Sequence, residues 1–240
     1  MAKSHARIEF GRAFRAARTL AADPDDLPQV FTIIEALSGG TMQRIADRMA
    51  KSETGRKLLA ERPDIVDVLV DREALARLPE GTLGRAYLAF VERENISAEG
   101  IRAAAVRGMT GRTPLPETAE WVHARMRDTH DLWHAAVGYQ GDVLGETALL
   151  AFSLAQTNNP AIALIVAIGL MKTIGKPEAR QVILDGFRRG KKAAWLPGQD
   201  WASMLALPVD EVRRRLSLEA PPRYTRVNSS ELKAAAGAAA

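Results

Sequence analysis

The sequence predicts an all-α protein built as a single multi-helix domain. The 240 residues include 41 alanines, and aromatic residues make up only 5%. Alanine loses no side-chain entropy in a helix, so this composition favours helix over sheet. Apolar residues recur at helical spacing along most of the chain, and few stretches alternate apolar and polar residues as half-buried strands do. Hydrophobic residues make up 47% of the chain, which argues against disorder and allows a sizeable core.

Helices follow one another along the first half of the chain. Residues 27–37 carry apolar side chains at helical spacing and end at Ser38-Gly39-Gly40. Residues 42–62 continue the pattern until Pro63, which cannot extend a helix. Further helices are expected over residues 64–78, over 83–91 with Thr82 as the N-cap, and over 97–107.

The second half begins with a loop at residues 108–116, which hold two Gly and two Pro. One long helix is expected from about Pro116-Glu117 to Val137, because proline is well tolerated in a first turn. The segment 138–145 is the next break. Later helices are expected over 146–156, 161–174, the residues after Pro177, and 209–216, with a mixed region at 191–208.

We expect three parts along the chain. Residues 1–24 form a basic, helical N-terminal extension with four arginines among apolar residues. Residues 25–222 form the all-α domain. Residues 223–240 form a flexible, low-complexity tail that ends in a run of alanines.

Composition excludes several kinds of site. The chain has no cysteine, so disulfides, thiolate metal sites and thiol nucleophiles are ruled out. The longest apolar run, residues 161–171, is much shorter than the roughly 20 residues that span a bilayer. No secretory signal is visible. The net charge of +4 permits attraction to an anionic surface, but no aromatic–basic interleaving supports nucleic-acid binding.

The informative motif is the pair His130 and His134. Residues four apart lie on one face of a helix, so both imidazoles can reach one ion. Asp131 lies on the flank of that face, and Glu146 follows beyond a glycine-bracketed turn. If the two helices pack antiparallel, Glu146 faces the histidines. Two His with one or two carboxylates can bind zinc, and an open site of this kind suits iron or manganese.

The same residues have a plainer interpretation, in which His and Asp side chains hydrogen-bond within a helix pair without any metal. His123 lies two helical turns before His130. It is a further ligand or proton shuttle on one interpretation, and a surface histidine on the favoured one.

With these residues in view, the chain resembles the Coq-four family of ubiquinone (coenzyme Q) biosynthesis proteins. The run Arg127-Asp128-Thr129-His130-Asp131-Leu132-Trp133-His134, followed by Gly138, Gly145 and Glu146, is similar to the family's His-Asp-x-x-His…Glu motif. Two further segments, residues 81–90 and 207–222, resemble the family's upstream glycine-leucine segment and its C-terminal end. The resemblance covers about residues 25–222, and its specific part is the metal motif.

This resemblance implies a divalent metal between two adjacent helices, zinc first and iron or manganese as alternatives. It implies His130, Asp131, His134 and Glu146 as the ligands. It also implies a metal-dependent carboxy-lyase that removes the C1 carboxylate of a methoxylated 4-hydroxy-5-polyprenylbenzoate, with C1 hydroxylation in the same step left open. Partners would be polyprenylated benzoate or quinone intermediates, other ubiquinone biosynthesis proteins and a membrane surface, and a homo-oligomer is allowed.

Further candidates surround the motif. Arg127 and Arg85 could pair with a substrate carboxylate, Asp128 could hold a histidine ring N–H, and Tyr87 could donate a hydrogen bond. A polyprenyl tail needs an apolar trough, and its candidate lining on the apolar segment 161–174 is Ile162, Ile165, Ile168 and Met171. The plainer interpretation of these four is the protein's own core.

Two other functions remain open from the sequence. One is a non-catalytic, lipid-binding scaffold that organises the ubiquinone enzymes at the membrane. The other, much less favoured, is a metal phosphohydrolase built on a His-Asp pair, which needs an additional upstream histidine; His123 is too close. A bacterial chain of this kind is expected in the cytoplasm, peripheral to the inner membrane.

Overall fold

The computed structural model describes residues 9–22, 26–38, 40–97, 100, 103 and 115–228, and these residues confirm the predicted all-α class. No strand occurs among them, and Thr82 and Pro208 form an isolated β-bridge. Most of the predicted helix over 97–107 and most of the loop at 108–116 lie outside the described residues. The helices are α1 (Phe10–Ala22), α2 (Leu27–Leu37), α3 (Thr41–Met49), α4 (Glu53–Glu61), α5 (Val66–Leu69), α6 (Arg72–Arg77), α7 (Leu83–Arg93), α9 (Glu117–Asp128), α10 (His130–Val137), α11 (Val143–Thr157), α12 (Pro160–Lys172), α13 (Pro177–Lys192), the 3-10 turn η1 (Leu196–Gly198), α14 (Trp201–Met204) and α15 (Val209–Arg215).

Side-chain caps explain why the first half contains more helices than the apolar pattern predicts. The segment 42–62 is two helices, because Ser52 accepts a hydrogen bond from the Gly55 N–H and starts α4 anew. The segment 64–78 is likewise split, because Asp71 caps α6 through the Ala74 N–H. The predicted N-cap Thr82 is confirmed at the start of α7.

The long helix predicted from 117 to 137 is also two helices. The break falls at Thr129, whose hydroxyl donates to the Arg125 carbonyl at 2.8 Å beside the backbone bond of 2.9 Å from the Thr129 N–H to the same carbonyl. A side-chain bond of this kind often bends a helix. The next helix, expected from residue 146, starts one turn earlier at Val143. Asp142 is its N-cap and accepts hydrogen bonds from the Leu144 and Gly145 N–H groups.

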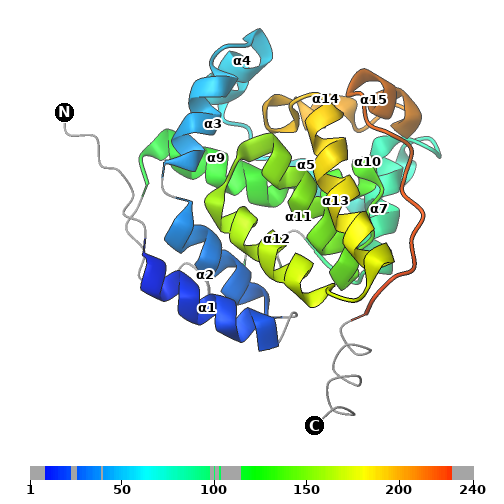
Figure 1. Ribbon diagram of the computed structural model, residues 1–240. Coiled ribbons are helices and arrows are strands. Elements are labelled where there is room, and N and C mark those ends of the chain that lie inside the picture. Colours follow the sequence, from blue (N-terminus) through cyan, green and yellow to red (C-terminus); the bar gives the residue numbers. More distant parts are fainter. Residues whose placement is uncertain are drawn as a thin grey trace.

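Helix α11 lies in the middle of the molecule, with α12 and α13 packed along it (Figure 1). Two glycines of α13 make the close approach to α11 possible. A Cβ atom at Gly190 would lie 2.5 Å from the Phe152 carbonyl oxygen, and one at Gly186 would collide with the Ala148 carbonyl. The backbones of α11 and α13 therefore touch where these glycines stand.

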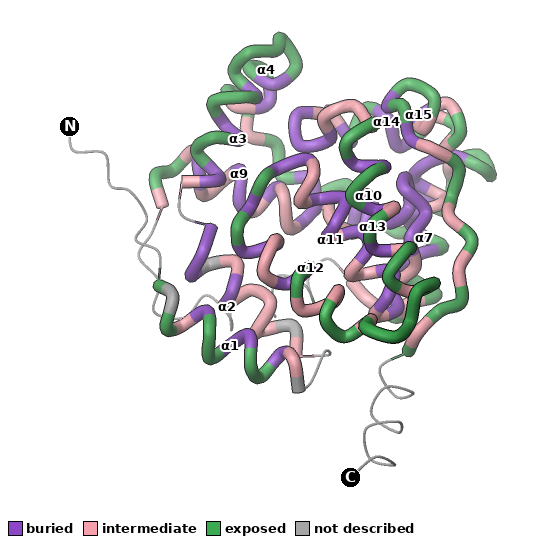
Figure 2. The backbone as a smooth tube through the Cα atoms, viewed as in Figure 1, coloured by how far each residue is buried: buried purple, intermediate pink, exposed green. Residues whose placement is uncertain are grey.

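The other helices cover this centre. Helix α10 packs against α7, α1 packs against α2, α2 rests on α12, and α3 packs against α9. Figure 2 shows that buried positions concentrate in α10 and α11, whereas α4 is mostly exposed. Helix α1 buries Ala13, Ala16, Ala17 and Leu20 in a cluster shared with α2 and α12. The predicted boundary near residue 25 stays a prediction.

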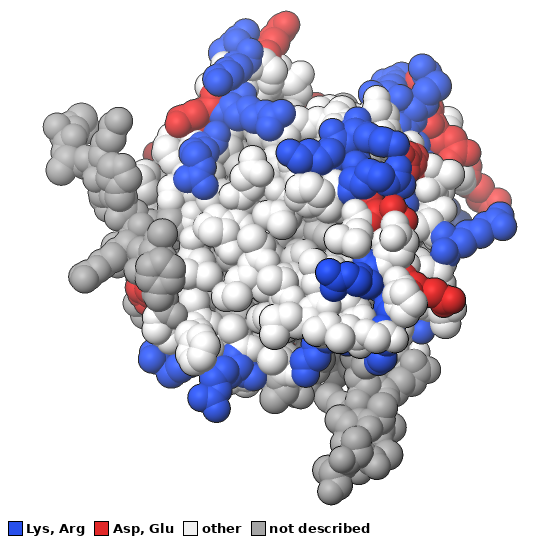
Figure 3. Space-filling model, in the orientation of Figure 1, with Lys and Arg blue, Asp and Glu red and all other residues white. Residues whose placement is uncertain are grey.

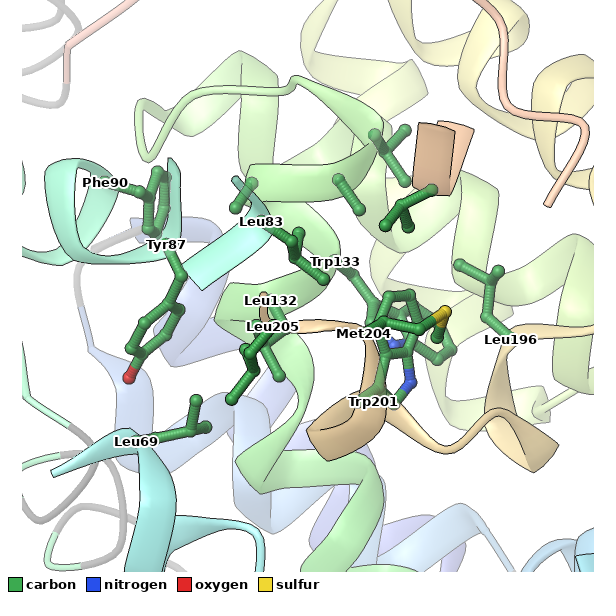
Figure 4. Packing of buried hydrophobic residues seen from close by; sticks show 14 of the residues in the cluster. Leu69, Leu83, Tyr87, Phe90, Leu132, Trp133, Leu196, Trp201, Met204 and Leu205 are labelled. Carbon is green, nitrogen blue, oxygen red and sulfur yellow. The ribbon is translucent and has the colours of Figure 1, made fainter. Parts of the chain in front are cut away.

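The largest hydrophobic cluster surrounds α10. Trp201, Met204 and Leu196 gather on one side of this cluster, and Tyr87 and Phe90 of α7 lie on the other (Figure 4). The core therefore holds α10 firmly between α7 and the C-terminal helices, and α10 is the helix that carries the histidine motif.

Of the described helices, none is long and apolar enough to cross a membrane.

Candidate metal centre

Two helices and the turn between them position the histidine motif. His130 is the first residue of α10, and His134 follows one turn later on the same face. The chain then reverses at Gly138, whose φ of 94° is a left-handed conformation that glycine adopts without strain. Helix α11 runs back with Glu146 in its first turn. The predicted placement of the candidate site between two adjacent helices is confirmed.

Three side chains converge in this site. The Nε2 atom of His130 lies 3.2 Å from Oε2 of Glu146, and the Nε2 atom of His134 lies 3.1 Å from Oε1 of the same carboxylate. The two Nε2 atoms are 3.2 Å apart. The two histidine rings meet edge to face, with centroids 4.8 Å apart.

The other side of the His134 ring is fixed by the protein. Its Nδ1 atom lies 3.0 Å from the Tyr139 carbonyl oxygen, which can only accept a hydrogen bond. Nδ1 therefore carries the proton, and in the neutral ring Nε2 presents a lone pair to the site. Phe90 of α7 stacks on this ring at 4.7 Å, and the His134 side chain is completely buried.

The residues present fit a divalent metal. Two nitrogen lone pairs and a carboxylate cannot lie this close together unless a proton or a metal ion lies among them. In a tetrahedral site with bonds of about 2.0 to 2.1 Å, neighbouring ligand atoms are about 3.3 Å apart. The Nε2–Nε2 separation of 3.2 Å is close to that value, and each Nε2 lies 3.1 to 3.2 Å from a different oxygen of the Glu146 carboxylate. With one ligand atom taken from each residue, the three atoms lie within 4.8 Å of one another. Two histidines and one carboxylate are also the ligand set of mononuclear iron(II) oxygenases.

The charges of the metal-free site oppose one another across the gap. Burial by itself would lower the pKa of His134, but the charge and hydrogen bond of Glu146, and then Asp131, raise it above the ordinary value. Burial would raise the pKa of Glu146, but the two histidines, His134 first, hold it well below its usual range. The site therefore favours a positive charge between these side chains.

Asp131 is not part of this three-residue group. Its side chain is buried, and burial is the main reason why its pKa lies above the ordinary value, against the opposing influence of His130 and His134. Of the four ligands that the sequence predicts, the structure brings three together. A direct ligand role for Asp131 stays a prediction.

The surrounding candidates make other contacts. Arg127 pairs with Asp128 through two hydrogen bonds of 2.7 and 3.1 Å, and both side chains are largely buried. Arg85 donates to the Ala76 carbonyl. Tyr87 lies buried in the large cluster beside α10.

The four candidates for a lipid-tail lining do not share one environment. Ile162 and Ile165 are buried in two clusters of the protein's own core, and Ile168 packs at the edge of one of them. Met171 is 67% exposed and lines an open hollow of about 700 Å³ at the end of α12, with Leu170 and Ile174.

The sequence argument missed several residues that build the site. Asp142 carries a recognisable signal, an acidic residue directly before an apolar helix. Phe90 and the carbonyl of Tyr139 carry none. Tyr224 also carries none, because it is 82 positions from Asp142, to whose Oδ2 it donates at 2.9 Å.

Fold and site together define a class: an all-α protein with a candidate His/His/Glu metal centre between two consecutive helices. The family model described as "Coenzyme Q (ubiquinone) biosynthesis protein Coq4" matches residues 7–222, so the chain belongs to this family. It is a ubiquinone biosynthesis protein, and the predicted family resemblance is confirmed.

Named relatives agree with this assignment, and one solved structure shares the fold. The chain is 31% identical over 217 residues to "Ubiquinone biosynthesis protein coq4, mitochondrial" of Pyrenophora tritici-repentis, covering 86% of this chain and 72% of the relative. It is 30% identical to the COQ4 homolog of Danio rerio, also named mitochondrial, covering 76% of this chain and 66% of the relative. A crystal structure of a Nostoc punctiforme PCC 73102 protein shares the fold, with a TM-score of 0.66 and 24% identity over 89% of this chain and all of the other.

Proposed function

We propose that this protein is a metal-dependent carboxy-lyase of ubiquinone biosynthesis. Its substrate would be a methoxylated 4-hydroxy-5-polyprenylbenzoate, which loses its C1 carboxylate. Family membership supports the pathway. The observation that supports the chemistry is the convergence of His130, His134 and Glu146, whose ligand atoms leave room for one cation.

The group is anchored on one side and open on the other. The His134 side chain is completely buried under Phe90, whereas His130 is 28% exposed and Glu146 is 42% exposed. A substrate carboxylate therefore has access from the side of His130 and Glu146. A bound divalent metal would supply Lewis-acid polarisation of a substrate oxygen as carbon dioxide leaves.

The identity of the metal decides the product. Zinc has no redox chemistry, so a zinc protein would replace the carboxylate by a proton. Two histidines and one carboxylate also suit iron, which could support replacement by a hydroxyl with dioxygen as the source of the oxygen atom and an external donor of two electrons, the second oxygen atom leaving as water. Zinc is the first candidate by family resemblance, and iron and manganese are the alternatives.

The direct test uses the purified full chain with a polyprenylated, methoxylated 4-hydroxybenzoate. Zinc, iron(II) and manganese are added separately, and release of carbon dioxide is measured. We expect turnover with one of these metals and none in a His134→Ala variant. Turnover that persists in His134→Ala would remove the metal from the mechanism. No turnover with any metal, together with co-purifying pathway enzymes, would favour the scaffold function.

One surface of the molecule supports association with a membrane, which the carboxy-lyase function and the scaffold function both need. Met171 and Ile174, 67% and 76% exposed, lie at the turn between α12 and α13. The exposed charged residues of the same stretch are the cations Lys172, Lys176 and Arg180 and one anion, Glu178. Figure 3 shows a broad uncharged area with lysines and arginines at its edges. Apolar side chains ringed by cations suit an anionic lipid surface, so we include a peripheral position on the inner membrane in the proposal.

The same surface lies beside the first turn of α11, which is the end of the helix that carries Glu146. Helix α12 runs antiparallel to α11, and a Cβ at Gly169 would collide with Thr147, the neighbour of Glu146. The hollow beside Met171 is therefore at the end of α11 that carries the metal ligand. We propose it as the entry for the polyprenyl tail.

A further inference from the structure

The C-terminal residues 219–228, called the strap below, run across the turn between α10 and α11. The Val227 N–H donates to Oδ1 of Asp142 at 2.9 Å, and the Val227 carbonyl accepts from the Val143 N–H at 3.0 Å. Arg226 forms two hydrogen bonds of 2.9 and 3.0 Å with Glu94 at the end of α7. The strap is therefore fastened to both sides of the candidate metal centre.

Two glycines of the turn fit the strap closely. A Cβ at Gly138 would lie 2.6 Å from Cβ of Pro221. A Cβ at Gly145 would collide with the Tyr224 hydroxyl and with the Gln140 carbonyl. Both glycines belong to the motif that the sequence singles out, and the strap is a physical reason for them.

At the centre of this contact is the Tyr224 hydroxyl. It accepts a hydrogen bond from the Gln140 N–H at 3.0 Å and donates one to Oδ2 of Asp142 at 2.9 Å. Burial raises the pKa of Tyr224 above its ordinary value, so the hydroxyl keeps the proton that it donates. Its ring packs near the ring of Tyr139, with centroids 6.1 Å apart.

Each partner of this hydroxyl leads to a ligand of the candidate metal centre. The Gln140 N–H belongs to the same peptide group as the Tyr139 carbonyl, which accepts from Nδ1 of His134. On the other side, Asp142 caps α11, and its carbonyl accepts from the Glu146 N–H at 2.8 Å. Hydrogen bonds in such a chain strengthen one another and fix the groups they join.

We propose that Tyr224 is a positioning residue of the metal centre, whose hydroxyl couples the peptide that orients His134 to the carboxylate that caps the helix of Glu146. The inference rests on the proposed metal centre. In metal sites, replacing a residue that orients a ligand through hydrogen bonds typically changes the metal affinity 10- to 100-fold.

The test uses Tyr224→Phe, which removes the hydroxyl and keeps the ring. Thr225→Val is the matched control, because it removes an exposed hydroxyl from the same strap. Asp142→Asn is a second variant, which keeps an oxygen for the helix cap and loses one carboxylate acceptor. Zinc affinity is measured by chelator competition on full-length protein. We expect about tenfold weaker binding in Tyr224→Phe and in Asp142→Asn, and wild-type binding in Thr225→Val.

A second readout needs no metal. In the metal-free protein labelled with ¹⁵N-histidine, NMR reports the Nδ1–H signal of His134. We expect this signal to shift in Tyr224→Phe and to stay in place in Thr225→Val. Wild-type zinc affinity in Tyr224→Phe overturns the inference. If wild-type protein binds no metal, the proposed metal centre fails, and an unmoved His134 signal then overturns the role of Tyr224 by itself.

Discussion

His134 is the residue with the most fully determined surroundings in the site. Its Nδ1 faces a carbonyl, its Nε2 faces a carboxylate and a second imidazole, and an aromatic ring covers it. A buried ring held on every side loses little freedom when it binds an ion. The same contacts make this ring hold a proton firmly when no metal is present.

Metal binding should therefore weaken as pH falls. Burial by itself would lower the pKa of His134, but Glu146 raises it above its ordinary value, so in metal-free protein Nε2 keeps its proton to a higher pH than a free imidazole does. Above the raised pKa the ring is neutral and binds metal without displacing a proton. Below it, affinity should fall about tenfold per pH unit for one displaced proton. Chelator competition between about pH 6 and about pH 9 measures this, and a flat affinity across that range would contradict it.

Among single residues, the sequence predicts the candidate metal ligands better than it predicts the groups that hold those ligands in place. The four-residue spacing of His130 and His134 places both rings on one face, and Glu146 is a carboxylate beyond a short turn, so helical geometry alone brings these three together. The supports are a backbone carbonyl and side chains from distant segments. Neither has a local pattern, because any residue supplies a carbonyl and Tyr224 is brought to Asp142 only by the folded chain.

At the element scale, the close packing of α11 and α13 depends on the absence of a side chain. Gly186→Ala places a methyl group against the Ala148 carbonyl, so one helix must move. We expect a loss of about 1 to 3 kcal/mol in the free energy of unfolding, measured by urea denaturation.

Gly11→Ala is the control for this substitution. Gly11 lies in α1 and is exposed, and a Cβ there would meet only Arg15 at ordinary contact distance. This change should leave stability unchanged or raise it by up to about 1 kcal/mol, because alanine favours helix. Equal stability of the Gly186→Ala and Gly11→Ala variants would show that the two helices tolerate a wider spacing.

Element boundaries were predicted less well than the presence of helices. The apolar period continues across Ser52, Asp71 and Thr129, so it predicts longer helices than the structure shows. At each break one polar side chain bonds to the backbone: Ser52 and Asp71 cap a new helix, and Thr129 bonds back to the turn before it. None of these bonds changes the apolar pattern. A cap signal inside a long apolar pattern deserves as much weight as the pattern.

At the scale of the whole molecule, the end of α12 should bind membranes. A Met171→Glu, Ile174→Glu double variant places two charges where apolar side chains now face solvent. We expect the full-length protein to sediment with vesicles of anionic phospholipid at low salt, and the double variant to lose this binding.

The control variant also replaces two exposed apolar residues by glutamate, one in α5 and one directly after it. Val68 and Val70 are each 40% exposed. The Val68→Glu, Val70→Glu variant has the same net charge as the first double variant and should still bind. If the two double variants sediment equally, the membrane-facing surface lies elsewhere.

The all-α class could be predicted from the amino-acid composition and from the helical spacing of the apolar residues, because both are properties of the whole chain. The architecture did not, because it depends on contacts between distant segments, such as α7 with α10 and the strap with the turn before α11. Those contacts are also what turn a pair of histidines and a glutamate into one site.

The central claim is that His130, His134 and Glu146 together bind a divalent metal ion. Metal analysis of the purified protein by mass spectrometry tests it most directly, with Glu146→Gln and His130→Ala beside the wild type and Thr225→Val as a control. We expect about one metal ion per chain in the wild type and the control, and a large loss in both ligand variants. Metal content that is unchanged by either ligand substitution would contradict it.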